Sequence, residues 1–175
     1  MVFKLQHRGD NGYTDILCKG RILKDDIRCE VCGTLDELSS FLGLAKSMVK
    51  RKAIIDLIEK IQKELLLIGT EVATSRRYIK YLKKRLNKEH LGFIERKIEE
   101  LQRSFVKDKH SFAIPGKNSL SSVLDVARTV CRRLERRMVT LKRKRGLERS
   151  FSLLYINRLS DLLYLLARAA EKRFR

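Results

Sequence analysis

The sequence contains no tryptophan, one proline and few aromatic residues of any kind. Proline interrupts the hydrogen-bond ladder of a helix, so its scarcity beside long tracts of Leu, Ile, Glu, Lys and Arg favours an all-α fold. No apolar run is long and uncharged enough to cross a bilayer, and residues 1–10 lack the apolar stretch of a signal peptide. We therefore expect a helical, cytoplasmic protein without a membrane segment.

Acidic residues are scarce relative to basic ones. The chain has 40 Lys and Arg against 21 Asp and Glu, which gives a formal net charge of +19. An excess of this size predicts attraction to phosphate-bearing partners, without saying which phosphates. At 175 residues, the chain suits one domain over residues 1–175, which buries roughly 70% of the surface of its unfolded form.

Cysteines number four, and only Cys29 and Cys32 form a C-x-x-C pair. A structural zinc site needs four ligands, and no second C-x-x-C pair or nearby pair of histidines accompanies this one. We expect free thiols in a reducing compartment and no metal held by protein ligands, with a zinc site as the alternative.

Apolar residues recur at helical spacing in five segments, which predicts a five-helix bundle over residues 33–175. The first predicted helix begins at Thr34, because Thr34 and Glu37 have the spacing of a capping box, and it runs to about Lys50. The other helices are predicted from about 52 to an end between 74 and 86, then over 88–105, 119–145 and 148–173.

Residues 1–32 have a different character. This polar segment contains Gly9, Gly12 and Gly20. We interpret it as an ordered loop with at most short strands. Backbone amides at glycines can approach a phosphate closely, and Lys24 adds a positive charge. The segment is therefore a candidate phosphate-binding loop.

The predicted helix over 119–145 carries the sharpest functional signal. Arg128, Arg132 and Glu135 recur at i, i+4 and i+7, so they share a stripe within about a 60° arc. Arginine's rigid fork suits bidentate contact with phosphate or carboxylate oxygens. The alternative is a set of ordinary exposed ion pairs, each worth a few tenths of a kcal/mol. The predicted core face of this helix consists of Val123, Ala127, Val130, Leu134, Met138 and Leu141.

The last predicted helix repeats this arrangement of a polar stripe beside an apolar face. Its polar stripe consists of Asn157, Asp161, Tyr164 and Arg168. Its predicted core face consists of Ile156, Leu159, Leu163, Leu166 and Ala170.

Six short motifs occur in order along the chain. They are Gly9-Asp10-x-Gly12-x-Thr14, Gly20-Arg21-Ile22-x-Lys24-Asp25-Asp26, Gly33-Thr34-x-Asp36-Glu37-Leu38, Phe112-x-Ile114-Pro115-Gly116, Ala127-Arg128-Thr129-Val130-Cys131-Arg132-Arg133-x-Glu135-Arg136 and Tyr155-Ile156-Asn157-Arg158-Leu159-Ser160-Asp161. Together they resemble the PduO-type ATP:cob(I)alamin adenosyltransferase family. Each motif alone is weak, whereas all six in order are hard to obtain by chance.

The resemblance implies a ferritin-like five-helix bundle behind an irregular ATP-binding segment, assembled as a homotrimer with ATP bound between neighbouring subunits. It implies a transferase that moves the 5′-deoxyadenosyl group of ATP to the Co(I) centre of a reduced corrinoid such as cobalamin. Triphosphate leaves and adenosylcobalamin forms. It further implies Mg²⁺ beside ATP, and as partners a corrinoid reductase and an adenosylcobalamin-dependent enzyme.

The resemblance also implies roles for individual residues. Arg128 pairs with Asp36 of the adjacent subunit, and Phe112 faces the corrinoid and helps to keep the lower axial ligand off the cobalt. The alternatives are that Phe112 is a loop aromatic over the core and that Asp36 is a first-turn carboxylate of its helix. The residues implied to wrap the triphosphate are Gly9, Asp10, Gly12, Thr14 and Lys24. The residues implied to complete the nucleotide site are Arg132, Glu135 and Asn157.

The sequence departs from the family's pattern at three places. Gln6-His7-Arg8 stands where the family usually has Thr-Arg-Thr, Lys117 replaces a glycine, and Asp125 replaces a histidine ahead of Arg128. These changes put hydroxyl contacts to the nucleotide and the corrinoid preference in doubt.

A basic helical nucleic-acid-binding protein is the competing interpretation. Residues 76–85 interleave two tyrosines with six basic residues, which suits phosphate contacts with aromatic stacking. This interpretation leaves the glycine segment and Asn157 without a purpose, so nucleic acid is not the partner that we expect.

Overall fold

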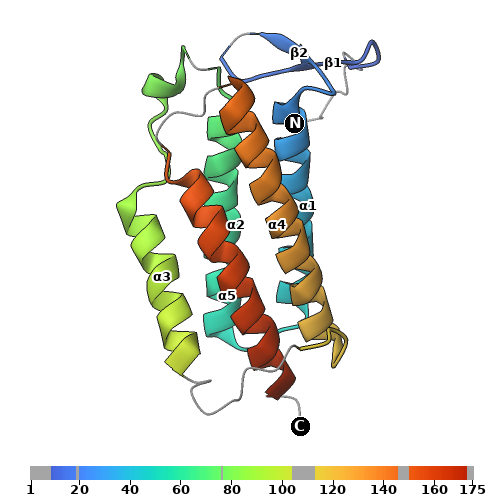
Figure 1. The fold of residues 1–175 in the computed structure, drawn as a ribbon, viewed down its shortest axis with the longest axis vertical. Helices are drawn as coiled ribbons and strands as arrows, with labels where there is room; N and C mark the ends of the chain where they lie inside the picture. The colour runs from blue at the N-terminus through green and yellow to red at the C-terminus, as the bar shows by residue number, and fades with distance from the viewer. Residues whose placement is uncertain (1–8, 19, 76, 104–112, 146–149, 173–175) are drawn as a thin grey trace, which may run out of the picture.

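Two short strands precede a bundle of helices (Figure 1). The strands β1 (Tyr13–Asp15) and β2 (Arg21–Leu23) form an antiparallel hairpin. The computed structural model describes residues 9–18, 20–75, 77–103, 113–145 and 150–172. Within these residues, five α-helices and one 3-10 helix follow the hairpin: α1 (Ile27–Ser47), α2 (Lys52–Ala73), η1 (Ile79–Tyr81), α3 (Lys88–Arg103), α4 (Ser119–Arg145) and α5 (Ser152–Lys172). The predicted all-α, five-helix fold is confirmed.

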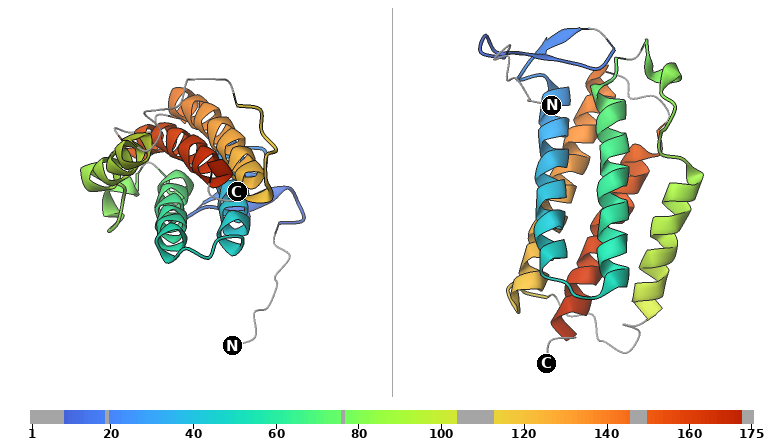
Figure 2. Two further views of the ribbon diagram at one scale, coloured as in Figure 1. Left: turned by 90° about the horizontal axis from the view of Figure 1, so that it is seen from below. Right: turned by 180° about the vertical axis from the view of Figure 1, so that it is seen from behind.

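The helices lie alongside one another, with α3 at one edge against α5 (Figures 1 and 2). Helix α4 packs against both α1 and α5, and α1 packs against α2. Seen along the bundle, α1 and α2 form one side, and α4 and α5 form the other (Figure 2). The hairpin lies across the end at which α1 begins and α2 and α4 end.

Helix α1 begins seven residues earlier than the sequence analysis predicted, at Ile27 instead of Thr34. Asp26 is its N-cap, with Oδ1 accepting a hydrogen bond from the backbone N–H of Arg28 at 2.9 Å. Thr34 lies within the helix and donates its hydroxyl to the carbonyl of Glu30 at 2.6 Å. The predicted capping box is therefore wrong, and the irregular segment ends before residue 32. Asp26 is an equally good capping residue, and the helix that it caps includes the buried Val31.

The other helix ends differ less from the predictions. Helix α2 ends at Ala73, just before the predicted range of 74–86. There the carbonyl of Ala73 accepts a hydrogen bond of 3.1 Å from the backbone N–H of Leu17, which follows the first strand of the hairpin. Helix α4 has the predicted bounds. Helix α5 begins at Ser152, whose N–H donates to the hydroxyl of Ser150 at 3.0 Å. The predicted ends at 105, 148 and 173 lie outside the described residues.

The predicted core faces of α4 and α5 are buried, except that Val123 is only half-buried. A fully buried Leu, Ile or Met side chain contributes about 1.5–3 kcal/mol to folding. Apolar burial therefore holds α4 against α1 and α5, and it fixes the rotation of each helix about its axis. None of the helices within the described residues is long and apolar enough to cross a membrane.

Two buried glutamates on α2 fix α5 by directed contacts. The hydroxyl of Tyr155 donates to Glu64 at 2.5 Å, and burial raises the pKa of this tyrosine. Glu71 accepts hydrogen bonds from Ser150 and Ser152 at the start of α5. Its negative charge at a helix N-terminus is favourable. These contacts determine where α5 begins and therefore where Asn157 lies.

Candidate functional site

The hairpin brings three of the predicted phosphate-binding residues together. Gly12 has a φ of 78°, in the left-handed region that favours glycine, and its carbonyl accepts from the backbone N–H of Lys24 at 2.8 Å. A Cβ on Gly9 would lie 3.0 Å from the ammonium of Lys24. We call Gly9, Gly12 and Lys24 the glycine cradle. Asp10 is exposed beside it, and Thr14 is half-buried in β1.

A second polar group lies on the other side of the bundle, between α4 and α5. Nδ2 of Asn157 donates to Oε1 of Glu135 at 2.8 Å, and Nη1 of Arg158 donates to Oδ1 of Asn157 at 2.8 Å. These two contacts use both ends of the amide, so they fix its orientation. We call Arg128, Arg132, Glu135 and Asn157 the α4–α5 polar patch.

The arginines of the polar patch differ in exposure. Arg132 is exposed, whereas the side chain of Arg128 is 27% exposed and lies 3.5 Å from Asp125. The predicted stripe on α5 is only partly an exposed surface. Asp161 and Tyr164 are exposed, but Arg168 is 8% exposed and pairs with Asp125. Arg168 belongs to the predicted polar stripe but is buried, because carboxylates of α4 and α5 pair with it.

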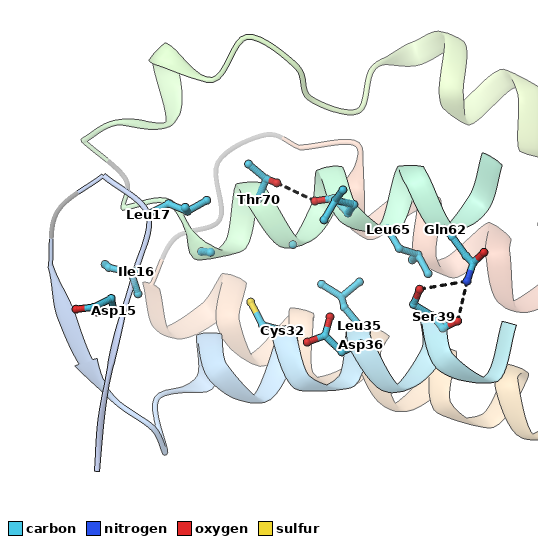
Figure 3. Close-up of a pocket in the computed structure, with 13 residues that line it drawn as sticks. Asp15, Ile16, Leu17, Cys32, Leu35, Asp36, Ser39, Gln62, Leu65 and Thr70 are labelled. Atoms are coloured by element: carbon cyan, nitrogen blue, oxygen red, sulfur yellow. Dashed lines mark hydrogen bonds between the residues drawn. The ribbon is translucent and has the colours of Figure 1, made fainter. Parts of the chain in front are cut away.

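A cavity of about 470 Å³ lies between α1, α2 and the hairpin (Figure 3). Its lining is mostly apolar, and Asp36 and Cys32 of α1 are among its polar groups. Burial, and then the neighbouring Asp36, raises the pKa of the Cys32 thiol to about 11. The thiol is therefore protonated at neutral pH and is a poor nucleophile.

The start of α1 decides one alternative for Asp36. Because α1 begins at Ile27, Asp36 lies well beyond the first turn, whose acidic residue is Glu30. The interpretation of Asp36 as a first-turn carboxylate is therefore wrong. The carboxylate is exposed at the cavity between α1 and α2, where it is accessible to another molecule.

One chain does not bring all the predicted residues to one place. The glycine cradle lies at the end of the bundle, Asp36 lies on the α1–α2 side, and the polar patch lies on the α4–α5 side (Figure 2). Phe112 lies outside the described residues, so its role stays a prediction. All four cysteines are free.

Comparison with known proteins decides the family. Residues 5–170 match the cobalamin adenosyltransferase family over most of the chain. This chain belongs to that family. The predicted resemblance to this family is confirmed.

Similar proteins agree on this family. The corrinoid adenosyltransferase of Citrobacter freundii is 40% identical over 165 residues, which are 93% of this chain and 92% of the relative. The corrinoid adenosyltransferase of Bacillus subtilis is 36% identical, over 94% of this chain and 84% of the relative. A variant of the PduO-type ATP:corrinoid adenosyltransferase from Lactobacillus reuteri, solved with cobalamin and ATP, superposes with a TM-score of 0.88. That variant is 32% identical, and the match covers 96% of this chain and 93% of the other.

Sequence reasoning missed two features of the site. Arg158 directly follows Asn157, and helical spacing does not flag neighbours at i, i+1. Cys32 and Asp36 share a face of α1 at i, i+4. The predicted helix began at Thr34, so Cys32 lay outside it and the shared face was missed.

Proposed function

We propose that this chain is an ATP-dependent corrinoid adenosyltransferase, which transfers the 5′-deoxyadenosyl group of ATP to the Co(I) centre of a reduced corrinoid such as cobalamin. The observation that carries the proposal is that a member of this family contains both the glycine cradle and the α4–α5 polar patch. A glycine cradle with a lysine suits a triphosphate, and the Glu135–Asn157 contact beside Arg132 suits the rest of a nucleotide.

The proposed reaction requires cations beside the leaving group and does not require a general base. Co(I) attacks the 5′ carbon of ATP, the bond from that carbon to oxygen breaks, and its electron pair leaves with triphosphate. Negative charge grows on the departing oxygen, so preorganised cations there lower the barrier. Lys24 and Arg132 are the candidates for this role. No general base is required, because the nucleophile carries no proton.

The thiols of Cys32 and Cys131 are not competing nucleophiles. A thiolate could attack the same carbon or bind the metal. Burial holds the pKa of Cys32 at about 11 and raises the pKa of Cys131 even more strongly. Both thiols therefore stay protonated at neutral pH.

The complete site needs two copies of the chain. Asp36 lines the cavity between α1 and α2, whereas the polar patch joins α4 to α5. These two pairs of helices form opposite sides of the bundle (Figure 2), and both sides carry exposed apolar side chains that another copy can cover. Leu66, at the cavity, is 71% exposed, and Leu154 on α5 is 50% exposed. A head-to-tail contact between different faces generates a closed ring when the rotation from one copy to the next closes. The family resemblance supports a homotrimer, in which Arg128 of one subunit pairs with Asp36 of the next.

A magnesium ion fits this arrangement as a companion of ATP. The described residues hold no cluster of three or more His, Cys, Asp or Glu side chains suited to a metal. Mg²⁺ at nucleotide sites relies mainly on phosphate oxygens and water, so a protein cage is not needed. When bound, the ion neutralises charge on the triphosphate, and the exposed carboxylate of Asp10 beside the glycine cradle is a candidate ligand. A cytoplasmic location, a corrinoid reductase and an adenosylcobalamin-dependent partner enzyme remain predictions of the resemblance.

The test is anaerobic incubation of the full chain with chemically reduced cobalamin, ATP and Mg²⁺. Formation of the cobalt–carbon bond is followed by absorbance, and the released triphosphate is assayed. We expect activity in the wild type and a loss of about 100-fold or more in Arg132→Ala, since one preorganised charge contributes roughly that much. Arg96→Ala, at an exposed position on α3, is the matched control and should retain full activity. A wild-type protein that forms no adenosylcobalamin, or an Arg132→Ala variant with normal turnover, contradicts the proposal.

A further inference from the structure

A buried cluster of four charged side chains joins α4 to α5 beside the polar patch. One terminal nitrogen of Arg168 contacts Oδ2 of Asp125, and Nη1 lies 3.0 Å from Oε1 of Glu171. The other oxygen of Asp125, Oδ1, lies 3.5 Å from Nε of Arg128. One carboxylate therefore faces two guanidinium groups that come from different helices.

The two arginines of this cluster are held very differently. Arg168 is 8% exposed and has a carboxylate on either side, so it is an anchor inside the fold. The side chain of Arg128 as a whole is more exposed, but its Nε is buried and donates no hydrogen bond to any described residue. Asp125 thus attracts Arg128 by charge without closing a two-point hydrogen-bonded pair. The guanidinium is oriented, but its capacity to bind another carboxylate or phosphate is not used up.

Charge balance makes Asp125 the residue on which this orientation depends. The cluster contains two carboxylates and two guanidinium groups, and Asp125 is 5% exposed. Removing its charge leaves Arg168 with Glu171 but leaves no counter-charge facing Nε of Arg128. A buried charge that loses its partner reorients or draws in water.

We propose that Asp125 is a positioning residue for Arg128, and that it acts on the reaction through that arginine. This inference rests on the proposed function, in which Arg128 completes the site shared with a neighbouring subunit. Arg168 fixes the carboxylate, and the carboxylate in turn fixes the direction of Arg128. Asp125 itself is buried and does not touch a substrate.

If Asp125 only stabilised the fold, the kinetic results would differ, and Glu171→Gln separates this structural role from the positioning role. Glu171 is the second carboxylate on Arg168, so its neutralisation loosens the same buried cluster. It does not face Nε of Arg128. Both Asp125→Asn and Glu171→Gln should lower the melting temperature by several degrees, because each breaks a buried ion pair. Only Asp125→Asn should change the kinetic constants.

The experiment is a double-mutant cycle on the full chain, with Asp125→Asn, Arg128→Ala and the double variant, and with Glu171→Gln as control. Adenosylation is measured with both substrates in excess over the enzyme, at an enzyme concentration high enough that weak variants still give a rate. The constants kcat and KM are separated for ATP and for reduced cobalamin. We expect Asp125→Asn to lower kcat/KM by about tenfold in the wild-type background and by less than about twofold in the Arg128→Ala background. Glu171→Gln should stay within about twofold in both backgrounds.

Several results would overturn the inference. Wild-type kinetics in Asp125→Asn, an equal loss with and without Arg128, or a loss in Glu171→Gln as large as that in Asp125→Asn each does so. If Asp125→Asn does not fold, Asp125→Glu keeps the charge but moves the carboxylate, and wild-type kinetics in that variant refute the idea. Failure of the proposed function is distinguishable, because the wild type itself would then form no adenosylcobalamin.

Discussion

The contact between Glu135 and Asn157 gives a sharp prediction for Asn157→Asp. The amide donates to the Glu135 carboxylate at 2.8 Å, so the substitution sets a second carboxylate against the first. Two like charges at this separation repel by about 6 kcal/mol at an effective dielectric constant near 20, which is an upper value for half-buried groups. Protonating an ordinary carboxylate at pH 7 costs roughly 4 kcal/mol. The variant pair should therefore hold one shared proton near neutral pH and lose it as the pH rises.

The pH dependence of activity reports this shared proton. A charge-assisted hydrogen bond contributes about 1.5–3 kcal/mol, which corresponds to roughly 10- to 150-fold in rate. We expect Asn157→Asp to lose activity by that factor at about pH 8.5 and to regain much of it near pH 6.5, where the proton restores a donor. The measurement is kcat/KM for ATP in the anaerobic cobalamin assay over this pH range, beside the wild type, which should show no comparable gain.

A second substitution in the same chain provides the control. Glu135→Gln combined with Asn157→Asp exchanges the amide and the carboxylate, so a hydrogen bond can form again at unchanged net charge. The double variant should exceed Asn157→Asp by about tenfold at high pH. Wild-type kinetics in Asn157→Asp at both ends of the pH range, or a double variant weaker than either single one, would refute the reasoning.

Three further predictions concern the fold. Gly12→Ala should destabilise the protein by about 1–2 kcal/mol and raise the KM for ATP, because φ at Gly12 is 78°. Gly33→Ala, within α1, should instead stabilise the protein slightly. Thermal melts of the two variants and ATP titration check these effects. Tyr155→Phe should cost roughly 2–3 kcal/mol in urea unfolding, since the buried Glu64 loses its donor, and a loss below about 0.5 kcal/mol would contradict this. The unfolding free energy should be steady below pH 9 and should fall between pH 9 and 11. The Cys32 thiol has a pKa of about 11 in the folded protein and 9.0 ordinarily, so it ionises first in the unfolded chain. Cys32→Ser should show a smaller fall in the unfolding free energy over this range.

The sequence predicted α4 almost completely, and the reason lies in its length. Twenty-seven residues of uninterrupted 3.6-residue periodicity leave little freedom in placing the ends or the buried face. The start of α1 was missed because two capping signals compete there. Asp26 and Thr34 both suit an N-cap, and contacts from α4 favour the earlier one, with Arg137 pairing with Glu30 and contacting the hydroxyl of Thr34.

Contacts between helices limited the prediction of the site. The polar stripe on α4 followed from spacing alone, but its meeting with Asn157 joins residues 22 positions apart. The burial of Arg168 did not follow from the polar stripe on α5, because its partner Asp125 lies 43 positions earlier in the chain. Periodicity indicates which face of a helix is polar. It does not say which polar face another helix covers.

The central claim is that the site is shared by two subunits, and mixing two inactive variants tests it most directly. Lys24→Ala damages the glycine cradle and Arg132→Ala damages the polar patch, so each protein alone should be nearly inactive. In rings assembled from equal amounts of the two, a site is intact when its cradle comes from the second variant and its patch from the first. Random mixing makes this about one site in four. We predict recovery of roughly a quarter of wild-type adenosylation after co-assembly, and a mixture that stays as inactive as its components would contradict the shared site.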